Sequence, residues 1–530
     1  MATPESHVFP SDSPLKRQDF PEGFIFGASA SAFQYEGAVD QDGRGPSIWD
    51  TFLEEKYPDI VKDGGLEAIQ HYYQYKDDVQ VIKETGLDIY RFSISWPRIL
   101  PMGRRIVPEV GERMIEDGIN EAGIEFYNGL INKLLANGIE PMVTLYHWDV
   151  PQALEDEYLG FLDKRIVCDF ADYADLCFSR FGDRVKYWIT FNEPWSFSVG
   201  GYSMGTFAPG RGASSNERAQ MIFDFPTSRA TSKQASMATG APKEGNPGTE
   251  PYIVSHHQLL AHAAAVKLYR EKYQREQGGK IGITLVSNWT VPYHDTKEDK
   301  DAAQRALDFM FGWFMDPITY GDYPSTMRSL VGNRLPLFTP IESELLVGSF
   351  DFLGFNYYTA NYVKNAPNYE SDAHYKLDSQ AECTPVRDNV PIGEQAASDW
   401  LYVYPKGILE HVDYIREKYN NPIIYITENG RDELNQPELS YWVSLFDHKR
   451  ISYHYRHLQF LKKAIANGAN VEGYFVWSLM DNLEWSSGFK TRFGMNFIDF
   501  KNGLKRYPKL SSGWFKFFLH EDVQPKAEEL

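Results

Sequence analysis

Residues 422–430 read Pro-Ile-Ile-Tyr-Ile-Thr-Glu-Asn-Gly, and residues 185–194 read Val-Lys-Tyr-Trp-Ile-Thr-Phe-Asn-Glu-Pro. Each stretch is a run of β-branched and aromatic residues that stops at a glutamate, Glu428 in the first and Glu193 in the second. Short apolar runs of this composition are typical of buried strands. A parallel sheet built from such strands would place both glutamates at its carboxyl edge.

Six further runs of the same kind bring the number of predicted strands to eight: 24–28, 89–95, 141–147, 185–193, 281–288, 352–359, 422–428 and 471–478. Segments with helical periodicity lie between them, at 71–85, 124–137, 169–181, 256–274, 301–315, 405–419 and 451–467. Two of these helices should end at Gly138 and Gly468, because glycine readily adopts the left-handed conformation of a helix cap. Strands that alternate with helices in this way predict an α/β fold, a single (β/α)8 TIM barrel.

The length of 530 residues would usually indicate several domains. One barrel with long loops accounts for it instead, and we place this domain at residues 19–520, between a flexible segment at 1–18 and a flexible tail at 521–530. Insertions follow three of the predicted strands, at 104–120, 208–251 and 360–398. These βα loops belong on the C-terminal face, where barrels of this kind build their active sites. The middle of 208–251 is equally consistent with a loop that has no role.

Composition and charge exclude several classes of function. The chain has 53 Lys and Arg against 73 Asp and Glu, a net charge of −20 that disfavours binding to nucleic acid or to an anionic membrane. Its three cysteines (Cys168, Cys177 and Cys383) lack metal-ligand spacing, so we expect free thiols and no structural zinc. The first residues lack a signal-peptide core, no apolar run is long enough to span a bilayer, and no nuclear or retention signal is evident, which predicts a cytoplasmic protein.

Glu193 and Glu428 would face each other across the mouth of the barrel. Glycoside hydrolysis needs such a pair, because one carboxyl group protonates the leaving oxygen while the other attacks the anomeric carbon or activates water. A single glutamate at a strand end is usually just a solvated terminus. Two of them, each beside an asparagine and each on a predicted barrel strand, favour a catalytic pair. An aromatic content of 15% also suits stacking surfaces for a sugar or a flat heterocycle.

The chain resembles the family 1 glycoside hydrolases, the retaining β-glucosidase family, over nearly its whole length. The resemblance is carried by Thr190–Pro194, Ile426–Gly430, Phe24–Ala38, Tyr90–Trp96, His147–Asp149, Asn356–Thr359 and Trp477–Trp485. The chain is similar to the plant branch of the family and, within it, to the raucaffricine and strictosidine type of alkaloid β-glucosidase. The resemblance implies a small-molecule β-glucoside as the partner and no metal or organic cofactor, and it leaves homo-oligomer formation open.

The same resemblance implies the roles of individual residues. Glu428 would be the nucleophile and Glu193 the acid/base, with the carboxyl groups about 5 to 5.5 Å apart as in retaining enzymes. An ionised nucleophile needs cationic and hydrogen-bonding neighbours, and the resemblance places Arg91 and Tyr358 beside Glu428. Arg91 and Asn356 are the implied supporting residues. The implied substrate contacts are Gln34, His147, Asn192, Tyr358, Trp400, Trp477, Glu484, Trp485 and Phe493. Weaker candidates for the aglycone side are Trp195, which could equally be a packing residue of the barrel, Phe207 and Ser398. Taken singly, His147 and Trp477 fit core residues better, and only their combination with the other strand-end residues favours sugar contacts.

The sequence is compatible with three functions. The leading one is hydrolysis of a neutral β-D-glucoside of a hydrophobic plant metabolite, such as an alkaloid glucoside, through a covalent glucosyl-enzyme. A transglucosidase would pass the same glucose to an alcohol acceptor. A catalytically silent sugar-binding protein is disfavoured, because neither Glu193 nor Glu428 is lost. Arg431 and Lys490 depart from the family pattern, which leaves the aglycone and the polarity of its pocket open.

Overall fold

The structure is a computed structural model that describes residues 15–105, 118–212, 243–367 and 373–520. Eight parallel strands close into a barrel in the order β1-β18-β16-β9-β7-β4-β3-β2. The bounds of these strands are β1 Ile25–Ser29, β2 Ile89–Ser93, β3 Glu140–Tyr146, β4 Tyr187–Asn192, β7 Lys280–Val286, β9 Phe352–Asn356, β16 Ile424–Asn429 and β18 Val471–Val476. All eight predicted strands are confirmed, and so is the (β/α)8 TIM barrel.

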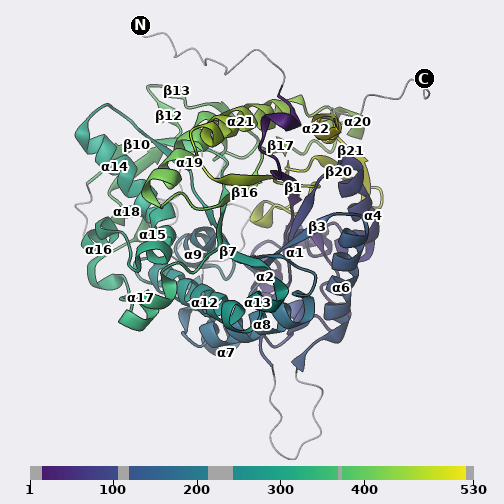
Figure 1. Ribbon diagram of the computed structural model, residues 1–530, viewed down its shortest axis with the longest axis horizontal. Coiled ribbons are helices and arrows are strands. Elements are labelled where there is room, and N and C mark those ends of the chain that lie inside the picture. Colours follow the sequence, from purple (N-terminus) through teal and green to yellow (C-terminus); the bar gives the residue numbers. More distant parts are fainter. Residues whose placement is uncertain (1–14, 106–117, 213–242, 368–372, 521–530) are drawn as a thin grey trace, which may run out of the picture.

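Helices surround the barrel on all sides (Figure 1). The main ones are α4 His71–Thr85, α6 Glu121–Ala136, α8 Ile166–Phe181, α12 Glu250–Lys272, α14 Lys297–Leu307, α15 Trp313–Tyr320, α19 Lys406–Lys418, α21 His448–Ala466 and α22 Leu510–His520. The helices α6 and α21 end as expected, because the glycines that follow their caps, Gly138 and Gly468, have φ of 73° and 97°.

Shorter elements make up the loops at the two ends of the barrel. The helices are α1 Ala32–Tyr35, α2 Ile48–Lys56, α3 Pro58–Lys62, α5 Trp96–Ile99, α7 Gln152–Tyr158, α9 Pro194–Tyr202, α13 Gln274–Gln277, α16 Ser325–Val331, α17 Pro340–Leu346, α18 Tyr375–Asp378 and α20 Tyr441–Ser444. The strands are β5 Arg211–Gly212, β6 Lys243–Glu244, β8 Trp289–Pro292, β10 Ala360–Asn365, β11 Ala381–Thr384, β12 Val386–Arg387, β13 Val390–Pro391, β14 Glu394–Gln395, β15 Tyr402–Val403, β17 Glu433–Leu434, β19 Thr491–Arg492, β20 Asn496–Asp499 and β21 Lys505–Pro508.

Two predictions about the helices were wrong. The segment 301–315 is not one helix, since α14 is followed by a π-helical segment, η5 (Asp308–Gly312), and then by α15. Pro317 lies inside α15, and its ring removes one backbone hydrogen bond and crowds the preceding turn, which favours such a change of winding. The sequence prediction also missed α22, whose aromatic residues and Gly513 have low helix propensity.

The insertions contain more regular structure than expected. Within 360–398, β10 is the middle strand of a three-stranded sheet between β8 and β11, so this region is not a simple polar loop. At the edges of 208–251, β5 pairs with β6. Residues 213–242 and 106–117, the centres of two predicted insertions, lie outside the described residues.

The packed part of the chain begins before residue 19. Leu15 is buried, and the guanidinium of Arg17 lies 4.9 Å from the centre of the Phe26 ring. These contacts hold the last residues of the segment 1–18 against the barrel. Residues 1–14 and the tail 521–530 lie outside the described part, and the domain boundaries themselves stay a prediction.

Side chains fill the interior of the barrel. One buried cluster draws its residues from six of the eight barrel strands: Ile89, Met142, Ile189, Phe352, Tyr425 and Phe475. Side chains stacked in this way make the centre of such a barrel a packed core and not a channel. Polar chemistry is therefore confined to the strand ends. Of the helices in the described ranges, none is long and apolar enough to cross a membrane.

Candidate active site

Glu193 and Glu428 lie where β4 and β16 end, and both strands are irregular there. The pairing of β4 with β7 shifts register between Ile189 and Asn192, and the pairing of β16 with β9 shifts between Ile426 and Glu428. Such bulges bend a strand end and redirect its side chains, and they are common beside active sites. Glu193 also has φ of 46°, in the left-handed region that few non-glycine residues adopt. Local backbone distortion therefore presents both carboxyl groups.

The Glu428 carboxylate is held by strong donors. Its Oε1 accepts a hydrogen bond of 2.6 Å from Arg91 Nη1, and its Oε2 accepts one of 2.6 Å from the Tyr358 hydroxyl. Glu428 is only 4% exposed and Arg91 is fully buried. A buried carboxylate is stable only when it is paired, and the guanidinium is that partner here. The two donors together hold the Glu428 side chain in one orientation.

Among the described residues, the hydrogen-bond partners of the Glu193 carboxyl group are neutral donors. Its Oε1 accepts from Asn356 Nδ2 at 2.7 Å, and its Oε2 accepts from the Ser196 hydroxyl at 2.7 Å. Burial and, after it, the charge of Glu428 raise the pKa of Glu193 to about 7. A carboxyl group with such a pKa is protonated over a useful part of the neutral range and can act as a general acid.

Asn192 connects the two carboxyl groups through hydrogen bonds. Its Oδ1 accepts from Arg91 Nη2 at 2.5 Å and from Asn356 Nδ2 at 3.2 Å. On the other side of Asn356, the Thr427 hydroxyl donates to Oδ1 at 2.7 Å, which fixes the orientation of that amide. An unbroken chain of contacts thus runs from Glu428 through Arg91 and Asn192 to Asn356 and Glu193.

Two polar side chains in the same region each have a buried atom that is unpaired. His147 Nε2 accepts from Asn192 Nδ2 at 3.0 Å, so the proton of the neutral ring is on Nδ1, which has no hydrogen-bond partner among the described residues. Burial and the positive charge of Arg91 lower the pKa of His147 well below its usual value. Glu484 Oε2 is likewise unpaired within the described ranges, and burial, followed by the charges of Asp432, Glu428 and Glu193, raises the pKa of Glu484 well above normal. Both groups can pair with sugar hydroxyls.

Aromatic rings border the carboxyl pair. Tyr358, Trp477 and Phe493 belong to one buried cluster, and Trp400 packs against it with its ring 5.7 Å from that of Tyr358. Trp485 lies 5.8 Å from the His147 ring in a stacked arrangement. The structure therefore gathers the predicted sugar contacts from strands and loops far apart in the sequence.

The other predicted contacts have partners within the protein. Gln34 uses both protons of its amide on Asn482 Oδ1 and the Leu483 carbonyl, at 3.0 and 2.7 Å, so it links α1 to the loop that bears Glu484. Among the weaker candidates, Trp195 donates to the Tyr375 hydroxyl, Phe207 packs against Trp49 and Trp148, and Ser398 donates to Asp432. Arg431, one of the two departures, is buried and lies 3.6 Å from Glu394.

Sequence reasoning missed Ser196, Thr427 and Trp148. Ser196 stands three residues after Glu193, a spacing that brings the two side chains together in the first turn of α9. Thr427 precedes Glu428 within the quoted strand, and Trp148 donates from Nε1 to the Asn192 carbonyl at 2.8 Å. Chain position was a signal for the first two, whereas the contact of Trp148 depends on tertiary packing.

Metal ligands are a separate question from the carboxyl pair. In the part of the chain that the structure describes, no group of three or more His, Cys, Asp or Glu side chains could hold a metal ion.

The similarity of the chain to known proteins covers almost all of it. The model of "Glycosyl hydrolase family 1" matches residues 16–523. Among curated proteins, the chain is 54% identical to β-glucosidase 24 of rice (Oryza sativa subsp. japonica), with 96% of this chain and 94% of that protein aligned. It is 49% identical to raucaffricine-O-β-D-glucosidase of Rauvolfia serpentina, with 99% and 95% aligned.

A solved structure gives the same result for the fold. A rice β-glucosidase mutant in a covalent complex with glucose superposes with a TM-score of 0.86 at 45% identity, over 95% of this chain and 99% of that one. The barrel, the paired glutamates at the ends of β4 and β16 and these full-length matches agree with one another. This chain belongs to glycosyl hydrolase family 1.

Proposed function

We propose that this protein is a retaining β-glucosidase in which Glu428 is the nucleophile and Glu193 is the acid/base. The observation that carries the proposal is the difference between the partners of the two carboxyl groups. Glu428 is bound by a guanidinium and a phenol, whereas Glu193 is bound by an amide and a hydroxyl. Two carboxyl groups with such different partners can divide the roles of acid and nucleophile.

In the first step, Glu428 attacks the anomeric carbon of the glucoside. The bond to the aglycone oxygen breaks, and that oxygen takes the proton of Glu193, so an alcohol leaves and a glucosyl ester of Glu428 forms. The pKa of about 7 allows Glu193 to hold this proton at neutral pH. Arg91 and Tyr358 keep Glu428 in position for the attack.

In the second step, water cleaves the glucosyl ester. Formation of the ester has removed the negative charge of Glu428, one of the causes that raise the pKa of Glu193. Glu193, which has already given its proton to the aglycone oxygen, therefore stays ionised and accepts a proton from the attacking water. Glucose leaves with its anomeric configuration retained, and both side chains return to their starting states.

The aglycone is, in this proposal, a hydrophobic plant metabolite, and a monoterpenoid indole alkaloid is one such group. Trp400 supports this, because its ring is only partly buried beside Tyr358. Two relatives support it as well: the raucaffricine glucosidase, and an isoflavonoid 7-O-β-apiosyl-glucoside β-glycosidase of Dalbergia nigrescens that is 50% identical. A hydrolysis screen over aryl, isoflavonoid and alkaloid β-glucosides tests the aglycone class. Trp400→Ala should raise KM for these but not for methyl β-glucoside, and Trp442→Ala, an exposed tryptophan on α20, is the control.

Azide rescue tests the roles of the two glutamates. In Glu428→Ala, azide can attack the activated glucoside from the empty side and yield the α-glucosyl azide. In Glu193→Ala, azide intercepts the glucosyl ester and yields the β-glucosyl azide. Opposite anomers from the two variants support the assignment. Near-wild-type hydrolysis by Glu428→Ala contradicts it, and adding an alcohol acceptor to the wild type separates hydrolysis from transglucosylation.

A cytoplasmic location belongs to the same proposal. The cysteines Cys168, Cys177 and Cys383 are free in the structure, which suits a reducing compartment. A fluorescent fusion of the whole chain, expressed in plant cells, tests this point: diffuse cytoplasmic signal is expected, and signal in the secretory pathway contradicts it.

A further inference from the structure

The residues 477–495 form the loop that joins β18 to β20, which we call the sugar loop because it carries four of the predicted substrate contacts: Trp477, Glu484, Trp485 and Phe493. Regular structure within it is limited to the 3-10 turn η7 (Trp485–Ser487) and the two-residue strand β19. Helix and strand hydrogen bonds therefore fix little of this loop. Backbone hydrogen bonds outside regular elements hold parts of it, such as those from Ser478 N–H to the Phe493 carbonyl and from Met495 N–H to the Ser478 carbonyl, and side-chain contacts add to them.

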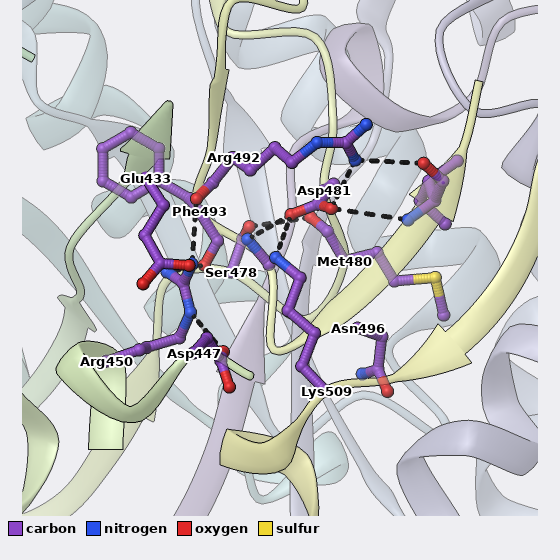
Figure 2. Close-up of polar contacts among 12 residues, drawn as sticks. Glu433, Asp447, Arg450, Ser478, Met480, Asp481, Arg492, Phe493, Asn496 and Lys509 are labelled. Atoms are coloured by element: carbon purple, nitrogen blue, oxygen red, sulfur yellow. Dashed lines mark hydrogen bonds and ion pairs between the residues drawn. The ribbon is translucent and has the colours of Figure 1, made fainter. Parts of the chain in front are cut away.

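Asp481 is a fully buried carboxylate at the base of the sugar loop, and Figure 2 shows it between two cations. Its Oδ1 accepts from Lys509 Nζ at 2.7 Å, and its Oδ2 accepts from Arg492 Nη1 at 2.6 Å. The backbone N–H of Gly494 also donates to Oδ1, at 3.0 Å. One side chain thus joins the start of the loop to its end and to the residue before α22.

The two ends of the sugar loop touch directly at Gly494. A Cβ atom on Gly494 would lie 2.0 Å from the backbone nitrogen of Asp481 and 2.2 Å from the carbonyl carbon of Met480. Only a residue without a side chain permits this approach. The close contact ties the position of the backbone beside Phe493 to that of Asp481. Phe493 is one of the aromatic residues beside Tyr358.

Arg450 extends the same network to the strand of the nucleophile. Its guanidinium is fully buried and donates to three carbonyl oxygens, those of Arg492, Phe493 and Arg431, the last only three residues after Glu428. Nε of Arg450 is bound to Asp447 at 2.8 Å (Figure 2). The contacts run from the sugar loop to the end of β16.

The charges of this cluster balance. Three acidic side chains (Asp481, Asp447 and Glu433) pair with three basic ones (Arg450, Arg492 and Lys509). A buried ion cluster tolerates its desolvation only when every member is paired, so the loss of one charge leaves its partner uncompensated. The arrangement is therefore sensitive to single substitutions.

We infer that Asp481 is a positioning residue for the proposed glucosidase reaction, acting by fixing the sugar loop relative to Glu428. In the described chain, its side-chain hydrogen bonds go to Arg492, Gly494, Ile498 and Lys509, and none goes to Glu193 or Glu428. The effect is expected on glucose binding and not on the ionisation of the catalytic pair. The inference rests on the proposed function, because it assigns the loop to the sugar.

The test is the affinity of Asp481→Asn for glucose and for two β-glucosides. The variant keeps the size of the side chain but loses its charge. We expect the inhibition constant of glucose and the KM values of methyl and 4-nitrophenyl β-glucoside to rise by a common factor of about ten or more, because the loop contacts the sugar and not the aglycone. The basic limb of the pH profile should stay in place.

Asp78→Asn is the matched control. Asp78 on α4 is equally buried and carries two partners of its own, His71 and Arg506. This variant should lose a similar amount of thermal stability while its glucose inhibition constant changes by less than about twofold. An equal rise in both variants would mean a general loss of stability and would overturn the inference.

A second variant, Arg492→Lys, keeps the test possible if Asp481→Asn folds poorly. Arg492→Lys keeps the charge but cannot reproduce the bond from Nε to Asn435 and the bond from Nη1 to Asp481 together, so a smaller rise of about threefold is expected. Unchanged glucose binding in a folded Asp481→Asn or Arg492→Lys variant overturns the inference. A wild-type protein that neither binds glucose nor cleaves the glucosides contradicts the proposed function instead.

Discussion

The surroundings of Glu193 and Glu428 differ although the two residues are alike. Both are glutamates at barrel strand ends, and both are more than nine-tenths buried. Glu428 accepts hydrogen bonds from a guanidinium and a phenol, whereas Glu193 accepts them from an amide and a hydroxyl. The pKa of Glu193 is raised to about 7. Burial is common to both carboxyl groups, so it is their different partners that distinguish the two proposed roles.

The largest effect is expected when the acid is removed. In Glu193→Gln, no proton can be delivered to the leaving oxygen, so kcat/KM for an alkyl β-glucoside should fall by about a thousandfold. Glucosides of acidic phenols need little protonation and should lose much less, and the limb of the pH profile near pH 7 should vanish. Steady-state rates over a series of leaving groups measure this. An equal loss for all leaving groups would contradict the assignment of Glu193.

The next effect concerns the partners of the nucleophile. Tyr358→Phe removes the donor to Glu428 Oε2 and should lower kcat/KM by about 10 to 100-fold, because the carboxylate loses a hydrogen bond that orients it. Tyr173→Phe is the control, since its hydroxyl is also buried but donates to the carbonyls of Ile94 and Leu145 and not to Glu428. Equal activity losses in the two variants would show that the Tyr358 hydroxyl has no special role.

A smaller change should follow from the loss of a partner of the acid. The Ser196 hydroxyl stabilises the charged form of Glu193 and so lowers its pKa. In Ser196→Ala, the pKa should rise and Glu193 should stay protonated to higher pH, which moves the basic limb of kcat/KM upward by a fraction of a unit. Ser198→Ala on the same helix should leave the limb unchanged. A shift of the basic limb to lower pH in Ser196→Ala would contradict the stabilising role of this hydroxyl.

Folding has a pH dependence that must be separated from that of catalysis. Burial lowers the pKa of His411 to about 3, so below its unfolded pKa near 6.5 the unfolded chain binds more protons than the folded one. Stability is full above that pH and falls as the pH drops from 6.5 toward 3, by up to about 1.4 kcal/mol per unit for this residue. The His411 ring packs against Phe311 and Phe355, so phenylalanine is a suitable replacement. His411→Phe should make the fall in Tm with decreasing pH less steep, while the limb of the activity profile near pH 7 stays in place. An unchanged slope of Tm against pH would contradict this expectation.

Much of this arrangement could be predicted from the sequence. The strands of the barrel carry local signals, since runs such as 424–429 are apolar, short and bounded by polar residues. The break at η5 was missed because one proline acts on backbone hydrogen bonds several residues away. Glu193 and Glu428 could be predicted as a catalytic pair because each of them ends a strand beside an asparagine.

The parts of the site that the sequence could not show depend on tertiary contacts. Nothing near Trp148 or Asp481 in the sequence indicates that one binds the Asn192 carbonyl and the other binds Lys509. The pKa of Glu193 is also set by burial and by a residue more than two hundred positions away. Roles that follow from local motifs were predictable, whereas roles that follow from packing required the structure.

The central claim is that the charge of Glu428 helps to keep Glu193 protonated until the glucosyl ester forms. Carbon-13 NMR titration of the Glu193 carboxyl group, in the free enzyme and in the ester trapped with a 2-fluoroglucoside, measures this directly. Our account predicts a pKa near 7 in the free enzyme, and a fall of at least about one unit in the trapped ester. An unchanged pKa after ester formation would contradict it.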